Sequence, residues 1–213
     1  MKLSQFENFP FGENTYILWN EESKRAAIID PGMMHDQERR AIKEFIDEHQ
    51  LVIEHLLLTH CHVDHAASAQ WVAQVYHVDV KACKDEASLA KSLAVQAQRF
   101  HLDIDVEPLA INHPIADGDV IKLDDVEIHV LGTPGHTPGG LTFYVPGISL
   151  AFTGDSIFQG SIGRTDLPGG DYTQLINSIE QKIITLPDKT VLASGHGPKT
   201  TVRHEKEYNP YIH

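Results

Sequence analysis

The sequence predicts an α/β fold in which two mixed β-sheets pack face to face and helices cover their outer faces. Strand-like apolar runs occur in pairs joined by short turns, as in hairpins, and also before helical segments, as in βα units. The chain has 213 residues, of which 41% are hydrophobic. This size and composition suit one large domain with a substantial core, so we expect a single domain over residues 1–213.

The first half of the chain is expected to begin with a hairpin. Two apolar runs flank a turn-like Asn-Glu-Glu-Ser segment, and Asp30-Pro31-Gly32 ends the second run. The next segment places Ile42, Phe45 and Ile46 at helical spacing with charged residues elsewhere, which is typical of an amphipathic surface helix. A buried strand and two further helices then form a βα unit. The predicted elements are strands at 14–19, 25–29 and 51–58 and helices at 36–50, 66–77 and 85–100.

The second half repeats this style with more hairpins and one clear helix. Asp171 is a candidate helix cap, with Gln174 in a capping-box arrangement. Leu186-Pro187 should end this helix, because proline cannot continue it. The predicted elements are strands at 120–123, 126–131, 141–145, 148–153 and 190–194 and a helix at 172–185.

The segment His60-Cys61-His62-Val63-Asp64-His65 follows directly after the predicted strand 51–58. Alternate side chains of an extended segment share a face, so His60 and His62 should point the same way and Cys61 away from them. Asp64 and His65 come where the chain must turn. Imidazole and carboxylate together suit zinc, iron or manganese. A loop of solvated histidines is the alternative, but this spacing of ligand-type residues argues against it.

Three further ligand-type residues, His136, Asp155 and His196, each follow another predicted strand and have glycine beside them. Glycine permits unusual dihedral angles and a close approach of the backbone. Strands of one sheet deliver their carboxyl ends to a common edge, where ligands gather in α/β proteins. Four such ends would bring together five His and two Asp, which is enough for two divalent metal ions.

The charge and the cysteine count limit the partners and the compartment. The formal net charge is −13, which argues against nucleic acid or an anionic membrane as a partner. Bound divalent metals would reverse this field locally, so a small anionic substrate remains compatible with it. Two cysteines, no signal peptide and no apolar run near ~20 residues indicate a cytoplasmic protein. A monomer is compatible with these features.

These motifs resemble those of the metallo-β-lactamase-fold hydrolases. The signature of that family is a His-x-His-x-Asp-His loop followed by a His, an Asp and a last His. Shorter segments are similar to the short glyoxalase II-like branch; they include 153–158, 160–166, 195–201 and 209–211. The resemblance implies an αββα four-layer sandwich of the metallo-β-lactamase fold, with the metals at one rim.

The resemblance also implies a role for each ligand-type residue. His60, His62 and His136 would hold the first metal, and Asp64, His65 and His196 the second. Asp155 would bridge both metals. Asp30 would orient the ligand loops, as groups around metal ligands do; a plain turn aspartate is the alternative.

Such a site suits thioester hydrolysis. Paired metals lower the pKa of a shared water toward neutrality, and the resulting hydroxide can attack an acyl carbon. One metal would stabilise the oxyanion, and Asp64 would orient the nucleophile as a catalytic residue. A thiolate leaves readily, because its parent pKa is near ~8.5. We therefore expect a metal-dependent hydrolase that cleaves S-lactoylglutathione or a related hydroxyacyl thioester. Cys61 is expected to be a small buried hydrophobe.

Arg164 is the candidate for substrate binding. By resemblance, a basic residue in this loop would bind a substrate carboxylate; the alternative is an ion pair with Asp166 that shapes the loop. Asn14 and Lys199 are weaker candidates. Larger glyoxalase II proteins carry a C-terminal helical domain, whereas only 17 residues follow His196 here. We therefore also consider a broader thioesterase activity, which is not limited to glutathione thioesters.

Two other functions remain open. An iron-dependent persulfide dioxygenase shares the scaffold but uses one iron, held by two His and one Asp. A non-catalytic metal-binding module would keep the ligands only for folding. Structural zinc sites usually close with four ligands, often Cys, so seven ligands without Cys favour catalysis.

Overall fold

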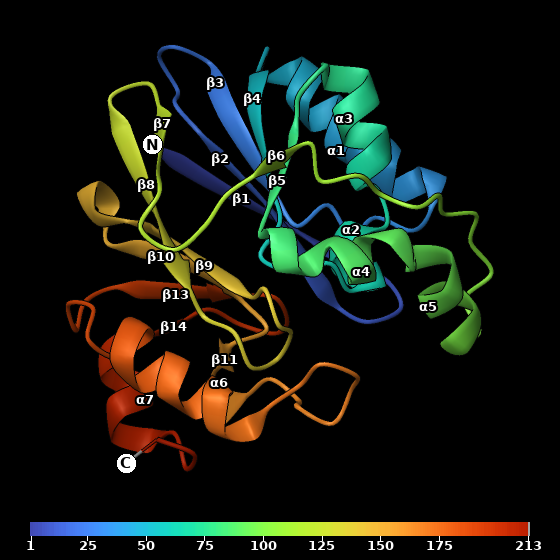
Figure 1. Cartoon of the computed structure of the whole chain (residues 1–213). Helices are drawn as coiled ribbons and strands as arrows, with labels where there is room; N and C mark the ends of the chain where they lie inside the picture. The colour runs from blue at the N-terminus through green and yellow to red at the C-terminus, as the bar shows by residue number, and fades with distance from the viewer. Residues whose placement is uncertain (213) are drawn as a thin grey trace.

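The computed structural model describes residues 1–212 and shows two six-stranded sheets that pack against each other (Figure 1). The first sheet has the order β1-β2-β3-β4-β5-β6. Its β1–β2 and β2–β3 pairs are antiparallel, and the pairs from β3 onward are parallel. The bounds are β1 Lys2–Asn8, β2 Glu13–Trp19, β3 Arg25–Ile29, β4 Val52–Leu57, β5 Val80–Ala82 and β6 His113–Pro114.

The second sheet has the order β14-β13-β10-β9-β8-β7, in which only β10 and β13 pair in parallel. A small third sheet pairs β11 with β12. The bounds are β7 Val120–Leu123, β8 Val126–Gly132, β9 Leu141–Val145, β10 Leu150–Gly154, β11 Ile157–Phe158, β12 Ser161–Ile162, β13 Val191–Ser194 and β14 Thr200–Thr201.

Alternation along the strands builds the layers. In β2, Tyr16 and Leu18 belong to the core between the sheets, whereas Ile17 belongs to the core beneath the helices. All seven residues of β2 are buried, as expected for a strand that is covered on both faces. The second half of β2, Tyr16 to Trp19, is accordingly a continuous apolar run, whereas Glu13, Asn14 and Thr15 are buried polar residues.

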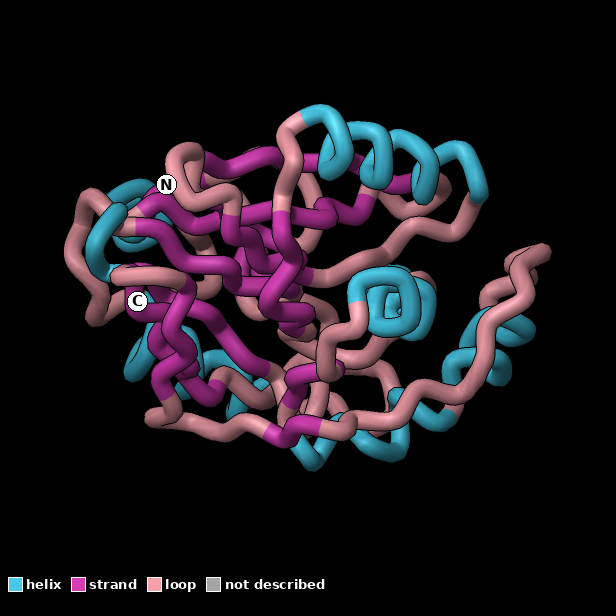
Figure 2. The backbone as a smooth tube through the Cα atoms, turned by 90° about the horizontal axis from the view of Figure 1, so that it is seen from above, coloured by secondary structure: helices cyan, strands magenta, loops and turns pink. Residues whose placement is uncertain are grey.

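Helices cover both outer faces of the sandwich. In Figure 1, α1 and α3 lie over the first sheet and α6 and α7 over the second; Figure 2 shows helices outside the strands from a second direction. Ile42 and Val72 join the first outer core, and Leu175 and Val202 the second. The bounds are α1 Asp36–Glu48, α2 Val63–Ala66, α3 Ala69–Tyr76, α4 Ala87–Lys91, α5 Leu93–Arg99, α6 Tyr172–Ser178 and α7 Val202–Tyr208, with 3₁₀ turns at Lys84–Glu86 and Pro146–Ile148.

Two predicted helices differ from the structure. The helix expected at 85–100 is a 3₁₀ turn followed by α4 and α5, because Ser92 leaves helical geometry and its hydroxyl donates to the carbonyl of Leu89. The helix expected at 172–185 changes after α6 into a π turn at Ile179–Ile183. Asp171 is the cap as predicted, since its carboxylate accepts the Gln174 N–H. The predicted capping box is incomplete, because the Asp171 N–H donates to the carbonyl of Gly135 and not to the Gln174 side chain.

The four-layer αββα sandwich confirms the predicted fold. Each of β4, β8, β10 and β13 is followed by ligand-type residues, so the layers position the site. No helix within residues 1–212 has the length and apolarity that a membrane crossing needs.

Candidate metal centre

The loop after β4 brings two histidines to a third one from the second sheet. One ring nitrogen each of His60, His62 and His136 lies within 4.8 Å of the others. His62 Nδ1 is 2.9 Å from His136 Nε2. Cys61 points away and is fully buried in the core beneath the helices, as the alternation predicted.

A second group forms beside the first. It joins Asp64 and His65, which lie in the short helix α2, to His196, which follows β13. His196 Nε2 is 3.3 Å from His65 Nε2 and 3.4 Å from Asp64 Oδ2. His65 is fully buried, whereas the side chain of His196 is 25% exposed. This group therefore faces the opening of the site.

Asp155 lies between the two groups. Its Oδ1 is 3.3 Å from His65 Nε2, and its Oδ2 is 3.6 Å from both His136 Nε2 and His196 Nε2. Asp155 Oδ1 is buried and has no hydrogen-bond donor in the described chain. The seven residues predicted as ligands thus converge on one volume; their assignment as ligands stays a prediction.

The glycines beside the ligands permit this convergence. A Cβ atom at Gly195 would lie 2.3 Å from Asp155 Oδ1 and 2.5 Å from a ring carbon of His65. Gly154 has φ +48°, and a Cβ there would lie 2.3 Å from Thr59 Oγ1. A larger residue at either position would clash with these atoms unless they shifted.

Hydrogen bonds fix which nitrogen of His60 faces the centre. Asp30 Oδ2 accepts the hydroxyl of Thr59 at 2.6 Å. Thr59 Oγ1 must then accept, at 3.1 Å, the Nδ1–H of His60. His60 Nε2 is left with a lone pair, and this buried atom has no partner among the residues described. An unpartnered buried acceptor of this kind is the environment that a cation would satisfy.

Three other histidines are held by their outer nitrogens in the same way. His136 Nδ1 is 2.7 Å from the carbonyl of Arg164, and His196 Nδ1 is 3.1 Å from the carbonyl of Phe11. His65 Nδ1 is 3.1 Å from Asp30 Oδ2. These acceptors require N–H donors, so each neutral ring points an Nε2 lone pair inward. Lone pairs that face each other at 3.3 Å repel unless a cation or a proton lies between them.

Asp30 therefore orients the ligand loops, as the resemblance implied. Its Oδ1 also accepts the Thr59 N–H at 2.7 Å. It has φ +48°, a left-handed conformation that costs free energy outside glycine and clusters at functional sites.

The histidines of the two ligand groups have pKa values shifted in opposite directions. Burial and the neighbouring imidazoles hold the pKa of His60 well below its usual range, and burial next to His136 lowers the pKa of His62 to about 4. Burial opposes a charge on His65, but Asp155 and Asp64 outweigh it and raise its pKa well above the usual range. Although burial alone would raise it, His65 and His196 lower the pKa of Asp155. The centre thus pairs acidic and basic groups where metals would bind.

Glu86 and Gln96 also build the site, because both form hydrogen bonds to backbone groups next to His62. Neither was predicted. The fully buried Glu86 carboxylate accepts the Cys61 N–H at 2.7 Å and the Gly139 N–H at 2.8 Å, so it joins the two loops that carry His62 and His136. Burial raises the pKa of Glu86. The sequence did indicate that Glu86 is buried, because residue 86 lies at helical spacing from the buried residues 90, 93 and 97.

The candidates for substrate contact have different surroundings. The Arg164 guanidinium donates two 2.7 Å hydrogen bonds to Asp166, which is the predicted alternative, and Arg164 also lines a 200 Å³ pocket over the metal centre. The buried Asn14 amide donates to the carbonyls of Ser194 and Gly197, so it shapes the His196 loop. The Lys199 ammonium lies 5.8 Å from the centre of the Tyr16 ring.

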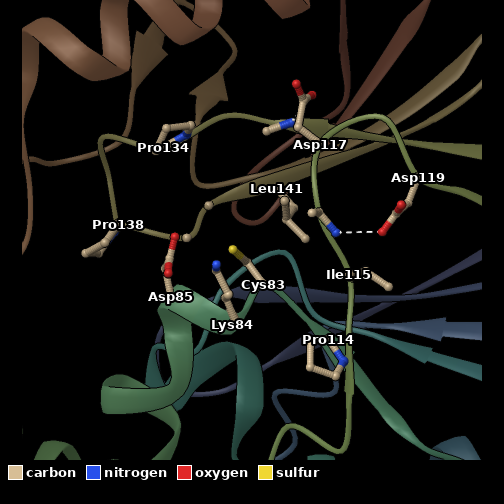
Figure 3. A pocket seen from close by; sticks show the side chains of 14 residues that line it. Cys83, Lys84, Asp85, Pro114, Ile115, Asp117, Asp119, Pro134, Pro138 and Leu141 are labelled. Carbon is tan, nitrogen blue, oxygen red and sulfur yellow. Dashed lines mark hydrogen bonds between the residues drawn. The ribbon is translucent and has the colours of Figure 1, made fainter.

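A larger cavity of about 510 Å³ lies on another side of the 134–141 segment, and none of the seven ligand-type residues lines it (Figure 3). Cys83, Asp117 and Leu141 are on its wall, and Asp119 there accepts the Ala116 N–H. Size alone therefore does not locate the chemistry of this protein.

The family model of the metallo-beta-lactamase superfamily matches residues 8–196 of this chain. The chain belongs to this superfamily. The hydroxyacylglutathione hydrolase GloC of Haemophilus influenzae is 40% identical over 206 residues, which cover 95% of this chain and 93% of that protein.

Solved structures of the superfamily are similar over the whole chain. The BLEG-1 B3 metallo-beta-lactamase has a TM-score of 0.90 at 34% identity and covers 99% of each chain. TTHA1623 in a di-iron-bound form has a TM-score of 0.86 at 31% identity and covers 98% of this chain and 100% of that chain. These likenesses confirm the predicted resemblance and the predicted fold. The chain is a metal-dependent hydrolase, and its His and Asp clusters fit a divalent-metal site.

Proposed function

We propose that this hydrolase cleaves hydroxyacyl thioesters, such as S-lactoylglutathione, into a hydroxy acid and a free thiol. The observation that carries the proposal is the pair of three-residue ligand groups on either side of Asp155, with inward lone pairs on His60, His65, His136 and His196. The similarity to the hydroxyacylglutathione hydrolase of Haemophilus influenzae supports this substrate class.

The donor set fits two divalent ions, zinc or alternatively iron or manganese. His60, His62 and His136 would hold one ion, Asp64, His65 and His196 the other, and Asp155 both. When bound, the ions would supply an activated water at neutral pH and Lewis-acid stabilisation of the developing oxyanion.

The protein's own groups would orient the reaction. Asp64 Oδ2 lies 3.4 Å from His196 Nε2 and 4.0 Å from His65 Nε2, so this carboxylate can accept a hydrogen bond from the attacking water. Water adds its oxygen to the acyl carbon, the carbon–sulfur bond breaks, and the thiolate takes up a proton. Because a thiolate leaves readily, the mechanism needs no dedicated general acid.

The proposal is tested by metal analysis of the purified protein followed by assay with S-lactoylglutathione. We expect two metals per chain and thioester cleavage without oxygen. The Asp155→Ala variant should lose at least one metal and most activity, because the carboxylate between the two groups is gone. The matched control is Asp103→Ala, an exposed aspartate that lines neither the 200 Å³ pocket over the centre nor the hollow next to it. Full metal content with normal turnover in Asp155→Ala would contradict the bridging role.

The same assay separates the other functions. One iron per chain with thiol-dependent oxygen uptake would indicate a persulfide dioxygenase, although the complete second ligand group favours the hydrolase. Faster cleavage of a β-lactam than of any thioester would indicate the activity named for BLEG-1. Inactivity of the fully metal-loaded protein toward thioesters, lactones, β-lactams and persulfides would indicate a metal-binding module.

A further inference from the structure

A groove of about 420 Å³ continues from the metal centre along α4 and α5. It shares His62, Phe100 and Leu167 with the 200 Å³ pocket that contains Asp64, Asp155 and His196. The two hollows therefore adjoin, and a ligand that reacts in the smaller one can extend into the larger one.

The groove exposes apolar surface of α5, and the adjoining 200 Å³ pocket exposes Phe11 of the loop before β2. Val95 is 64% exposed, and Phe100 and Phe11 are also exposed. The Phe11 and Phe100 rings form an edge-to-face pair with centroids 5.9 Å apart, beside the metal centre. Apolar side chains gathered at a reactive site typically contact the substrate.

Arg99 gives this groove a free positive charge. It is exposed, it lines the groove at the last turn of α5, and no carboxylate in the described chain pairs with it. Arg164, by contrast, is already paired with Asp166 through two hydrogen bonds. A guanidinium without a partner suits a ligand carboxylate, which it can bind with two parallel hydrogen bonds. Asp85 also lines the groove and offers an acceptor for an ammonium or amide N–H.

The groove wall is connected to the metal-binding loop through Gln96 of α5. Its amide donates to the carbonyls of Cys61 and Leu89, and its oxygen accepts the Val63 N–H at 3.0 Å. These contacts bracket His62 in the chain. A ligand held against α5 is therefore held at a fixed place relative to His62.

Resting on the proposed function, we infer that the groove binds the thiol-carrier half of the thioester and that Arg99 binds a carboxylate of that carrier. A small hydroxyacyl group fits the 200 Å³ pocket, whereas a peptide-sized thiol needs the 420 Å³ groove. The substrate class is thus a small acyl group on a carrier that combines amide bonds with a free carboxylate.

The test uses two thioesters with the same lactoyl group, S-lactoylglutathione and the neutral S-lactoyl-N-acetylcysteamine. For Arg99→Gln, KM for the glutathione thioester should rise about tenfold with little change in kcat, because a charge-assisted hydrogen bond is lost. KM for the neutral thioester should stay unchanged. Arg99→Lys should recover part of the loss. Arg203→Gln, at an exposed arginine of α7, is the matched control and should change neither.

A second measurement follows binding without turnover. Calorimetric titration of the metal-loaded protein with glutathione should show about tenfold weaker binding in Arg99→Gln. Val95→Glu, which puts a negative charge one helical turn before Arg99, should weaken glutathione binding further than Val95→Gln does. Equal KM values of wild type and Arg99→Gln for the glutathione thioester would overturn the inference and leave the thioesterase intact. Cleavage of neither thioester by the metal-loaded wild type would overturn both.

Discussion

At the residue scale, Thr59 determines which nitrogen of His60 faces the metal centre. Its hydroxyl donates to Asp30 and accepts from His60, so this side chain connects the Asp30 carboxylate to His60, with which Asp30 forms no direct hydrogen bond in the described structure. No pattern in the sequence marks this residue, because a threonine at the end of a strand is ordinary. Its role follows only from the direction of the two hydrogen bonds.

Replacing Thr59 by valine keeps the shape and removes the hydroxyl. We expect Thr59→Val to weaken metal affinity about 10–100-fold, which is typical when a group that orients a metal ligand is lost. Metal content in competition with a chelator measures the effect. Thr190→Val is the control, because Thr190 is equally buried and its hydroxyl has no partner in the described structure. Equal metal retention in both variants would refute the orienting role.

The histidines of the second ligand group should release protons when metal binds. Asp155 and Asp64 raise the pKa of His65, and Asp64 likewise raises that of His196, against the effect of burial. A ligand must be deprotonated to bind, so affinity should fall as the pH falls through these raised pKa values. Calorimetry in buffers of different ionisation enthalpy should show proton release that shrinks as the pH rises above them. Proton release independent of pH from 6 to 9 would contradict this.

At the scale of elements, the sequence predicted the strands well because their apolar runs end at glycine, proline or the ligand motifs. It predicted one helix over 85–100, where the structure has a 3₁₀ turn, α4 and α5. Helical spacing persists through this break, so periodicity did not reveal it. The ligand motifs located the strand ends that converge, but β1, β5 and β6 were not identified, since short or edge strands carry weak alternation.

The turn before α4 supplies Glu86, which should stabilise the site as a whole. Glu86→Ala would leave the Cys61 and Gly139 N–H groups buried without acceptors, each at a cost of about 1–3 kcal/mol. We expect the free energy of unfolding to fall by roughly 2–4 kcal/mol, measured by urea denaturation. Glu44→Ala, at an exposed position of α1, should change it by less than about 0.5 kcal/mol. Similar losses in both variants would show that Glu86 does not join the two loops.

At the scale of the whole molecule, each predicted metal takes ligands from both sheets. His60 and His62 follow a strand of the first sheet, whereas His136 follows a strand of the second; the other metal combines Asp64 and His65 with His196 in the same way. The motif order in the sequence was sufficient to predict this convergence, because strand ends of a sandwich meet at one rim. It could not predict the hydrogen bonds around the ligands, which depend on side-chain directions of residues as far as 185 positions apart in the chain.

Metals that connect the two sheets should also stabilise their packing. A ligand at 100 times its dissociation constant adds about 2.7 kcal/mol per site, and a protein of this size gains about 2–4 °C in melting temperature per kcal/mol. Removal of the metals with a chelator should therefore lower the melting temperature by roughly 5–10 °C per site. Zinc should restore it in wild type, and the Asp155→Ala variant should respond much less to both treatments. If chelator and zinc left the wild-type melting temperature unchanged while metal analysis showed loss and recovery, the metals would bind without joining the sheets, and the convergence of seven side chains would serve catalysis alone.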